Sequence, residues 1–246
     1  MVLELRHAVT ARALRAMAVC TPWVEDEVRG LGRVVGAGDV VIDVGAALGV
    51  YTSVLSRLVG PAGRVMSVEP LPGLYATVDG WLRLRAPRNV HRYAVALGAS
   101  ASTATLSVPV RRGRPVAGRS VLTTGARGLG SNAEFAGQLE REVPVTTLDG
   151  LVDRAGPAQV DFVKVDVEGA ELALFRGAER TIERFRPYVL AEVEDRHLRR
   201  YGHTADDVVS WFRTRGYDVS TWQEGMWRLV PNVAEGCRNY LFRGRR

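Results

Sequence analysis

Short apolar runs rich in β-branched residues alternate along the chain with segments of helical periodicity. The first run is VVIDV at 40–44, and a helical pattern over 49–59 leads to RVMSV at 64–68. Runs without polar alternation are typical of parallel strands that are covered on both faces. Strand, helix and strand within so short a stretch predict a βαβ unit with a right-handed crossover.

The same alternation continues and predicts an α/β fold built on a doubly wound parallel sheet. Further strands are expected at 89–97, 161–166, 187–193 and 216–221, and further helices at 74–84, 170–185 and 205–215. Residues 1–35 predict two helices separated at Pro22, the second with Glu25, Asp26 and Glu27 in its first turn. We therefore expect an N-terminal helical extension over residues 1–38 and one domain over residues 39–246.

The stretch between the third and fourth strands departs from this alternation. Residues 103–110 and 142–146 alternate apolar and polar positions, which predicts exposed strands. Residues 111–130 hold several glycines and no acidic residue, and they predict a long mobile loop. Its polar residues include Arg111, Arg112, Arg114, Arg119 and Arg127, beside Ser120, Thr123 and Thr124. Such a loop either closes over a substrate that carries phosphate or carboxylate, or is simply solvated and flexible.

Composition narrows the class of protein. Of the 246 residues, 46% are hydrophobic and 24% charged, as expected for a folded domain rather than a disordered chain. The net charge is +6, yet Lys164 is the only lysine among 33 basic residues. Codon bias from a GC-rich genome therefore explains the arginine excess as well as anion binding does. Cys20 and Cys237 make no disulfide framework for a chain of this size.

The sequence also bears on location. No apolar run reaches the roughly 18 residues of a membrane span, because arginines interrupt each candidate stretch. The Arg-rich N-terminus lacks the continuous apolar core of a secretory signal, and we interpret it as a helix packed on the domain. We therefore expect a cytoplasmic protein with no membrane partner.

The turn after the first strand suggests a cofactor. Gly45 ends the strand and Gly49 begins the helix, while Asp43 and Glu69 stand at the ends of the first two strands. The pattern is neither G-x-G-x-x-G nor a phosphate loop. A carboxylate after the second strand suits a ribose diol, and one after the first suits a cation. A nucleoside with an amino-acid end and no phosphate fits both, namely S-adenosylmethionine; the alternative is that the glycines only form a tight turn.

The fourth predicted strand carries unexpected polar residues. Phe162, Lys164 and Asp166 should share one face, with Val163 and Val165 on the other. In a strand buried on both sides, a lysine and an aspartate are costly unless they are paired or functional. They form either a buried ion pair that orients the strand end, or a polar site at the carboxyl edge of the sheet. A single lysine in an arginine-rich chain suggests a specific role for its compact ammonium.

These segments together resemble the FkbM-like S-adenosylmethionine-dependent methyltransferases. The matching pieces are VIDVGAALGVYT at 41–52, VMSVEP at 65–70, VTTLDGL at 145–151 and DFVKVDVEGAE at 161–171, with Gly177-Ala178, Pro187 and Glu192 after them. They follow the family's order over about residues 39–245. Family members often have Asn where this chain has Ala47, so a side-chain contact near the cofactor is lost.

The resemblance implies a seven-stranded sheet in the order 3-2-1-4-5-7-6, whose last strand, at 239–243, is antiparallel. It also implies O-methylation, often of a sugar or natural-product hydroxyl, with S-adenosylmethionine as the cofactor. The residues expected to bind this cofactor are Asp43, Gly45, Ala46, Gly49, Tyr51, Thr52, Glu69, Pro70 and Asp166.

Methyl transfer to an aliphatic hydroxyl needs alignment of the acceptor oxygen and a base or a metal. The catalytic candidates are Lys164, Asp166, Glu168 and Glu192. Asp166 or Glu168 is the expected proton acceptor, with Lys164 organising the carboxylates or the developing alkoxide. His91 and His203 are expected to be surface or packing residues, and His197 is the reserve base because it shortly follows the fifth strand. Mg²⁺ held by the carboxylates is an alternative, but we favour no metal because Lys164 already neutralises the cluster.

Two other functions stay open. An RNA methyltransferase would use the positive charge, but no RNA-binding module or basic stretch interleaved with aromatic residues is recognisable, so we expect no nucleic-acid partner. A protein that binds S-adenosylmethionine without catalysis is compatible with Ala47. We expect a small-molecule hydroxyl acceptor, which can be anionic or glycosylated, and a homo-oligomer is compatible with the sequence.

Overall fold

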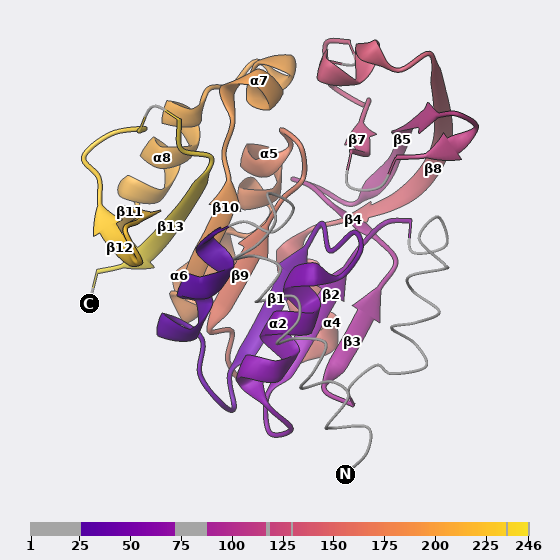
Figure 1. Ribbon diagram of the computed structural model, residues 1–246. Coiled ribbons are helices and arrows are strands. Elements are labelled where there is room, and N and C mark those ends of the chain that lie inside the picture. Colours follow the sequence, from indigo (N-terminus) through magenta and orange to yellow (C-terminus); the bar gives the residue numbers. More distant parts are fainter. Residues whose placement is uncertain (1–25, 72–87, 117–118, 129, 235, 246) are drawn as a thin grey trace.

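A central sheet of eight strands organises the protein (Figure 1). The computed structural model describes residues 26–71, 88–116, 119–128, 130–234 and 236–245. The strands of this sheet are β1 (Val40–Val44), β2 (Arg64–Val68), β3 (Val90–Tyr93), β9 (Phe162–Val165), β10 (Tyr188–Glu192), β11 (Tyr217–Gln223), β12 (Met226–Leu229) and β13 (Asn239–Gly244). Their order is β3-β2-β1-β9-β10-β13-β11-β12.

The sheet has one strand more than the seven expected. From β3 to β10 the neighbours are parallel, whereas β13 runs antiparallel to both β10 and β11. The additional strand, β12, pairs antiparallel with β11 at the edge of the sheet. The prediction missed it because Trp222 and Trp227, which face each other in this hairpin, stand in a short stretch without clear alternation.

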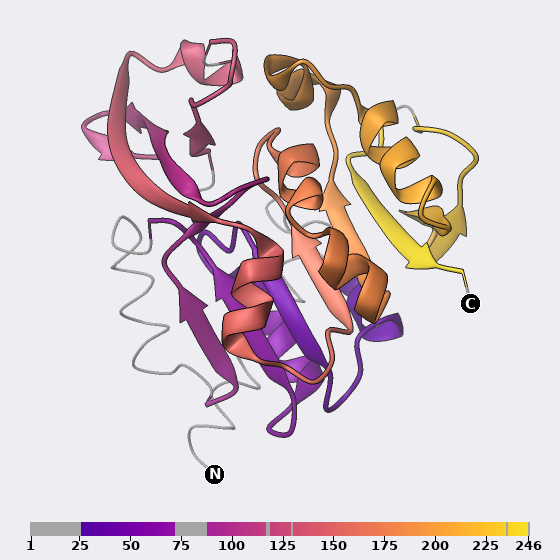
Figure 2. The ribbon, with the colours of Figure 1, turned by 180° about the vertical axis from the view of Figure 1, so that it is seen from behind.

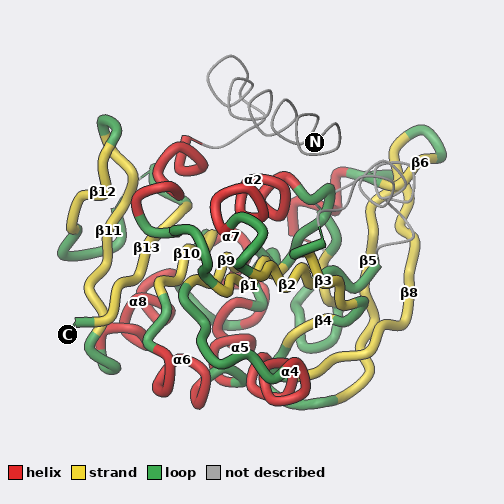
Figure 3. Tube along the Cα trace, turned by 90° about the horizontal axis from the view of Figure 1, so that it is seen from below, coloured by secondary structure: helices red, strands yellow, loops and turns green. Residues whose placement is uncertain are grey.

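Helices cover both faces of the sheet, as Figure 3 shows. One face carries α2 (Val50–Val59) and the 3₁₀ helix η1 (Asp26–Arg33), which bury Leu31, Val54 and Leu55 against Val41 and Phe162. The other face carries α4 (Leu148–Ala155), α5 (Glu171–Arg176), α6 (Glu179–Phe185) and α8 (Ala205–Arg213). Burial on both sides explains why the central strands β1, β9 and β10 are mostly apolar. Among the described helices, none is long and apolar enough to span a membrane.

A second, smaller sheet adjoins the carboxyl ends of the central strands (Figures 1 and 2). Its strands are β4 (Ala96–Leu97), β5 (Ser102–Arg111), β6 (Arg114–Pro115), β7 (Val121–Leu122) and β8 (Gly137–Thr146). β5 and β8 form a long antiparallel pair, and β7 pairs with β5.

Three expectations for this region are wrong. The single strand expected at 89–97 is divided, because β3 lies in the central sheet and β4 in the second sheet. The strand expected to be exposed at 103–110 is mostly buried, since Ala104, Leu106 and Val108 pack into a small core of their own. The segment expected to be one long loop contains β6 and β7, and the 3₁₀ helix η3 (Gly130–Glu134) begins at its end.

The helical predictions differ in detail. The helix expected at 170–185 is two helices, because the chain turns at Gly177 and Ala178 between α5 and α6. The second N-terminal helix is η1, whereas the helix expected at 74–84 and the first N-terminal helix lie outside the described residues. The remaining helices, α7 (Asp195–Leu198) and η4 (Arg199–Tyr201), follow β10.

Substitution of Gly177 tests the packing where the two sheets join. A Cβ at this position would lie 2.1 Å from the carbonyl oxygen of Gly98, which follows β4. We expect Gly177→Ala to lower the free energy of unfolding by about 1–3 kcal/mol, because one of the two backbones must move. In Gly36→Ala the nearest atoms would be 3.9 Å away, and we expect a change within about 0.5 kcal/mol. Equal effects of the two variants in urea unfolding would contradict this packing.

Candidate functional site

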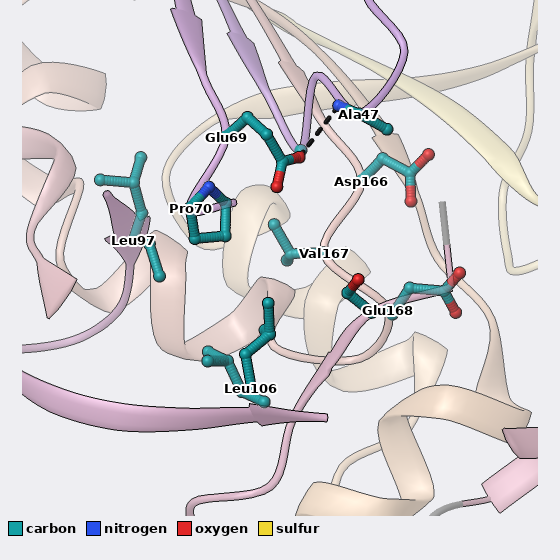
Figure 4. Close-up of a pocket in the computed structure, with 12 residues that line it drawn as sticks. Ala47, Glu69, Pro70, Leu97, Leu106, Asp166, Val167 and Glu168 are labelled. Carbon is teal, nitrogen blue, oxygen red and sulfur yellow. Dashed lines mark hydrogen bonds between the residues drawn. The ribbon is translucent and has the colours of Figure 1, made fainter. Parts of the chain in front are cut away.

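A cleft lies where the carboxyl ends of β1, β2 and β9 meet the second sheet (Figure 4). Its lining residues are Gly45, Ala47, Glu69, Pro70, Ala96, Leu97, Leu106, Ser120, Leu122, Asp166, Val167 and Glu168. Three carboxylate side chains line it, Glu69 on one side and Asp166 and Glu168 from the turn after β9 on the other, and apolar side chains fill much of the remainder. Open α/β sheets place their ligands at this edge.

The turn after β1 brings backbone to the cleft. Gly45 has φ +77°, and its N–H donates to the carbonyl of Val68, as does that of Ala46. A Cβ on Gly45 would lie 1.8 Å from the carbonyl oxygen of Asp166. Only glycine therefore allows β1 and β9 to end in contact here.

Glu69 is held rigidly at the end of β2. Its Oε2 accepts from the N–H of Ala47 at 3.0 Å, and its Oε1 accepts from the N–H of Leu71 at 3.0 Å. Burial raises the pKa of Glu69, and these two backbone hydrogen bonds act in the opposite direction. Each oxygen has a further lone pair, so the carboxylate can accept from two adjacent hydroxyls of a ligand.

The start of α2 supplies backbone donors next to this turn. Gly49, at φ +76°, is the N-cap residue, and no side chain caps the helix. The first amides of a helix have no intrahelical acceptor and attract anions. Glu69 therefore suits a diol, and the α2 N-terminus, which is not among the residues that line the cleft, suits a carboxylate.

Asp43 is buried behind the turn and does not line the cleft. Its Oδ2 accepts from the Thr52 hydroxyl, which also lies 3.0 Å from the Ser67 hydroxyl. Burial raises the pKa of Asp43 to about 6, although the Thr52 hydrogen bond and the Lys164 charge both lower it. The structure thus places Asp43 and Thr52 in a buried polar cluster between β1, β2 and α2.

Lys164 extends this cluster to β9. It is in register with Asp43 on the neighbouring strand and is 1% exposed. Its Nζ lies 4.9 Å from the centre of the Tyr51 ring and 3.4 Å from Oδ1 of Asn239. Phe162 packs in the core under α2 while Val163 and Val165 pack in the opposite core, so the predicted alternation of faces is confirmed.

In the turn after β9, the acidic residue Glu171 and the glycine Gly169 each make a defined contact. Glu171 begins α5, and its Oε1 accepts from the N–H of Gly169 at 2.9 Å. Gly169 has φ +108°, and a Cβ there would lie 2.6 Å from the carbonyl oxygen of His197. Burial raises the pKa of Glu171 to about 7.

Glu168 contacts His197, the histidine that the sequence predicts as a reserve base. Its Oε2 lies 3.1 Å from Nε2 of His197, and its side chain is 19% exposed. Burial raises the pKa of Glu168 to about 8, and the charges of Asp166 and Glu171 add to this. Burial lowers the pKa of His197. Both pKa shifts favour the uncharged forms of the two side chains.

The structure brings together some of the predicted site residues and separates others. Gly45, Glu69, Pro70, Asp166 and Glu168 line the cleft. Ala46, Gly49, Tyr51 and Thr52 are not among the lining residues, and Tyr51 and Thr52 contact the buried Lys164 and Asp43. Glu192, at the end of β10, is in register with Asn239 and is not among the lining residues.

Sequence reasoning missed the side of the cleft that the second sheet forms. Leu97, Leu106 and Leu122 come from β4, β5 and β7. Of these, Leu106 lies in the apolar alternation at 103–110, which predicts an exposed strand. Among the described residues of the predicted loop, Ser120 and Leu122 line the cleft, and its arginines do not. Within the described residues, no group of three or more His, Cys, Asp or Glu is arranged to hold a metal ion.

Comparison with known proteins identifies the family that the sequence motifs resemble. The family described as methyltransferase FkbM domain matches residues 43–219, which is most of the chain. No curated protein matches the sequence.

Several solved structures are similar to this chain at low sequence identity. Cofactor-bound Rv0187 from MTB is 15% identical with a TM-score of 0.50, over 97% of this chain and 89% of that one. Aeropyrum pernix fibrillarin, in complex with natively bound S-adenosyl-L-methionine, is 16% identical with a TM-score of 0.47, over 93% and 73%. FkbM from Methylobacillus flagellatus KT is 15% identical with a TM-score of 0.48, over 83% of this chain. This chain spans only 43% of that last structure.

Glu168→Gln should change how stability depends on pH. A carboxyl whose folded pKa lies near 8 keeps its proton while the unfolded chain loses it near pH 4.5, so it destabilises the fold progressively as pH rises between these values. We expect the variant to gain about 1–3 kcal/mol relative to the unchanged protein between pH 5 and pH 8. Urea unfolding at both pH values measures this, with Glu140→Gln as the exposed control. A Glu168→Gln effect that is the same at both pH values would show that the burial cost is absent.

Proposed function

Since the chain belongs to the FkbM methyltransferase family, we propose that it transfers a methyl group from S-adenosylmethionine to a hydroxyl of a sugar or natural-product acceptor. One observation carries this proposal. A single cleft has a backbone-held carboxylate, Glu69, on one side and a carboxyl of raised pKa, Glu168, on the other. The first suits a ribose diol and the second suits proton transfer, so one cavity can hold both reactants.

The residues present fit S-adenosylmethionine. Glu69 would accept from the ribose hydroxyls, and the uncapped start of α2 would bind the amino-acid carboxylate. Pro70 and Leu97 offer apolar surface for a flat base. The cofactor supplies an electrophilic methyl group on a sulfonium, and the protein has to place an acceptor oxygen in line with it.

Glu168 is the proposed proton acceptor. A hydroxyl oxygen becomes a good nucleophile when its proton leaves, and a base is most effective when its pKa is near the working pH. With a pKa of about 8, Glu168 takes the hydroxyl proton as the new oxygen–carbon bond forms. Asp166 lines the cleft beside it and stays the alternative base.

Lys164 has a supporting role in this proposal. It lies in the buried cluster with Asp43 and is not among the residues that line the cleft. Its ammonium therefore acts on the carboxyl ends of β1 and β9 rather than on a developing alkoxide. Glu192, at the end of the adjacent strand β10, also does not line the cleft and has a supporting role in this proposal.

Cofactor binding has a direct test in Glu69. We expect Glu69→Gln to weaken S-adenosylmethionine binding by about 10-fold or more, because the amide accepts at only one of its two terminal atoms. Isothermal titration of the unchanged protein, this variant and the exposed control Glu140→Gln measures the effect. If Glu69→Gln bound S-adenosylmethionine as tightly as the unchanged protein, the ribose would not bind at Glu69.

Catalysis has a separate test. A tritiated-methyl transfer screen against sugars, macrolides, phenols and RNA should label a hydroxyl compound. Its rate should rise with pH toward about 8 and fall by about 100-fold or more in Glu168→Gln. Label on RNA alone would establish the RNA methyltransferase instead. Cofactor binding with no transfer to any acceptor would favour a non-catalytic binding protein.

A further inference from the structure

A short segment after β10 contacts both the proposed base and the second sheet. It consists of α7 and η4, residues 195–201, and it approaches the cleft region from outside the lining (Figure 1). No motif of the sequence singled it out apart from His197. Its contacts nevertheless reach two walls of the cleft that come from different sheets.

The first set of contacts holds the turn after β9. Nε2 of His197 lies 3.1 Å from Oε2 of Glu168, which fixes the end of that side chain. The backbone of His197 presses against Gly169, where a Cβ would stand 2.6 Å from the His197 carbonyl oxygen. Glu168 itself has φ +53°, a conformation uncommon for a residue with a side chain. The turn thus depends on α7 for its shape.

The second set of contacts holds the roof, which we define as residues 119–128. The Tyr201 hydroxyl donates to the carbonyl of Leu122 at 2.6 Å. The buried guanidinium of Arg200 donates to the carbonyl of Gly128 from Nη2 at 2.7 Å and from Nε at 3.2 Å. The N–H of Arg127 donates back to the carbonyl of Arg200 at 2.7 Å. Two roof residues, Ser120 and Leu122, line the cleft.

We propose that α7 and η4 form a clasp that fixes the roof of the cleft and the side chain of Glu168 in one working geometry. Tyr201 is the positioning residue for the roof, and His197 is the positioning residue for Glu168. This inference rests on the proposed function for the role of Glu168 as base. Within this seven-residue segment, Tyr201 acts on acceptor binding through the roof, and His197 acts on proton transfer through Glu168.

The charges around the clasp are distributed over several elements. Glu168 faces Asp166 and Glu171 of its own turn, Arg196 of α7 and Arg119 of the roof. His197 faces Arg196 and Arg200 of the clasp, Glu194 before it and Asp166 across the turn. A His197 N–H that donates to Glu168 stabilises the ionised carboxylate, so its removal makes Glu168 harder to deprotonate.

Tyr201→Phe tests the roof without any ligand. The change removes one hydroxyl, so we expect amide hydrogen exchange over residues 119–128 to rise by about 10-fold, and the KM for the acceptor to rise with little change in kcat. Tyr188→Phe, at the amino end of β10, is the matched control and should leave both unchanged. Exchange in Tyr201→Phe equal to that in the control would overturn the clasp.

His197→Ala and His197→Gln test the other end. In His197→Ala we expect kcat to fall by about 10-fold or more and the midpoint of the pH–rate profile to move upward. Gln retains an N–H near the position of Nε2, so His197→Gln should restore most of kcat and the original midpoint. A packing role alone would lower stability in both variants without moving the midpoint, and that result would overturn the assignment of His197.

The two proposals fail in different ways. If the unchanged protein methylates no hydroxyl acceptor, the proposed function fails, and amide exchange still tests the clasp because it needs no ligand. If the unchanged protein is active but Tyr201→Phe and His197→Ala behave like it in exchange and pH profile, the clasp is wrong and the proposed function stands.

Discussion

The cleft depends on ionisable side chains that are buried from water near the carboxyl ends of β1 and β9. Asp43 and Lys164 stand in register on these neighbouring strands, both about 1% exposed. Opposite charges offset part of the burial cost, and Thr52, Ser67, Tyr51 and Asn239 supply the polar and aromatic contacts around them. This buried cluster joins β1, β2, β9 and α2, so the turns that follow these strands start from fixed positions.

The cleft depends on those fixed turns and on a second sheet. Gly45 and the backbone of Asp166 touch, which sets the distance between the Glu69 side and the Glu168 side of the cavity. β5 and β7 then cover it with Leu106 and Leu122, and α7 and η4 connect this cover to the Glu168 turn. Polar groups thus stand at the two ends of a cavity whose middle is apolar. In the proposed function, the apolar middle would exclude water from the reacting atoms, and Glu168 would stay within reach as the proton acceptor.

Local patterns made much of this predictable and long-range packing did not. β1, β2 and β9 follow from short runs that are mostly apolar, and Gly45, Glu69 and Glu168 follow from turns adjacent to them in sequence. The buried second sheet was missed because β5 gains its core only by pairing with β8, some thirty residues later. The contact of Glu168 with His197 likewise requires the chain to return after β10. β12 depends on its partner β11 at the edge of the sheet, which no single-strand pattern reveals.

In the proposed function, one cleft between the two sheets holds the cofactor beside Glu69 and the acceptor beside Glu168. A crystal structure of the protein with S-adenosylhomocysteine would show whether it does. We expect ribose hydroxyls on the Glu69 carboxylate, the amino-acid carboxylate at the start of α2, and the sulfur facing the Glu168 side of the cleft. A nucleoside bound elsewhere, with Glu69 making only its contacts to Ala47 and Leu71, would contradict it.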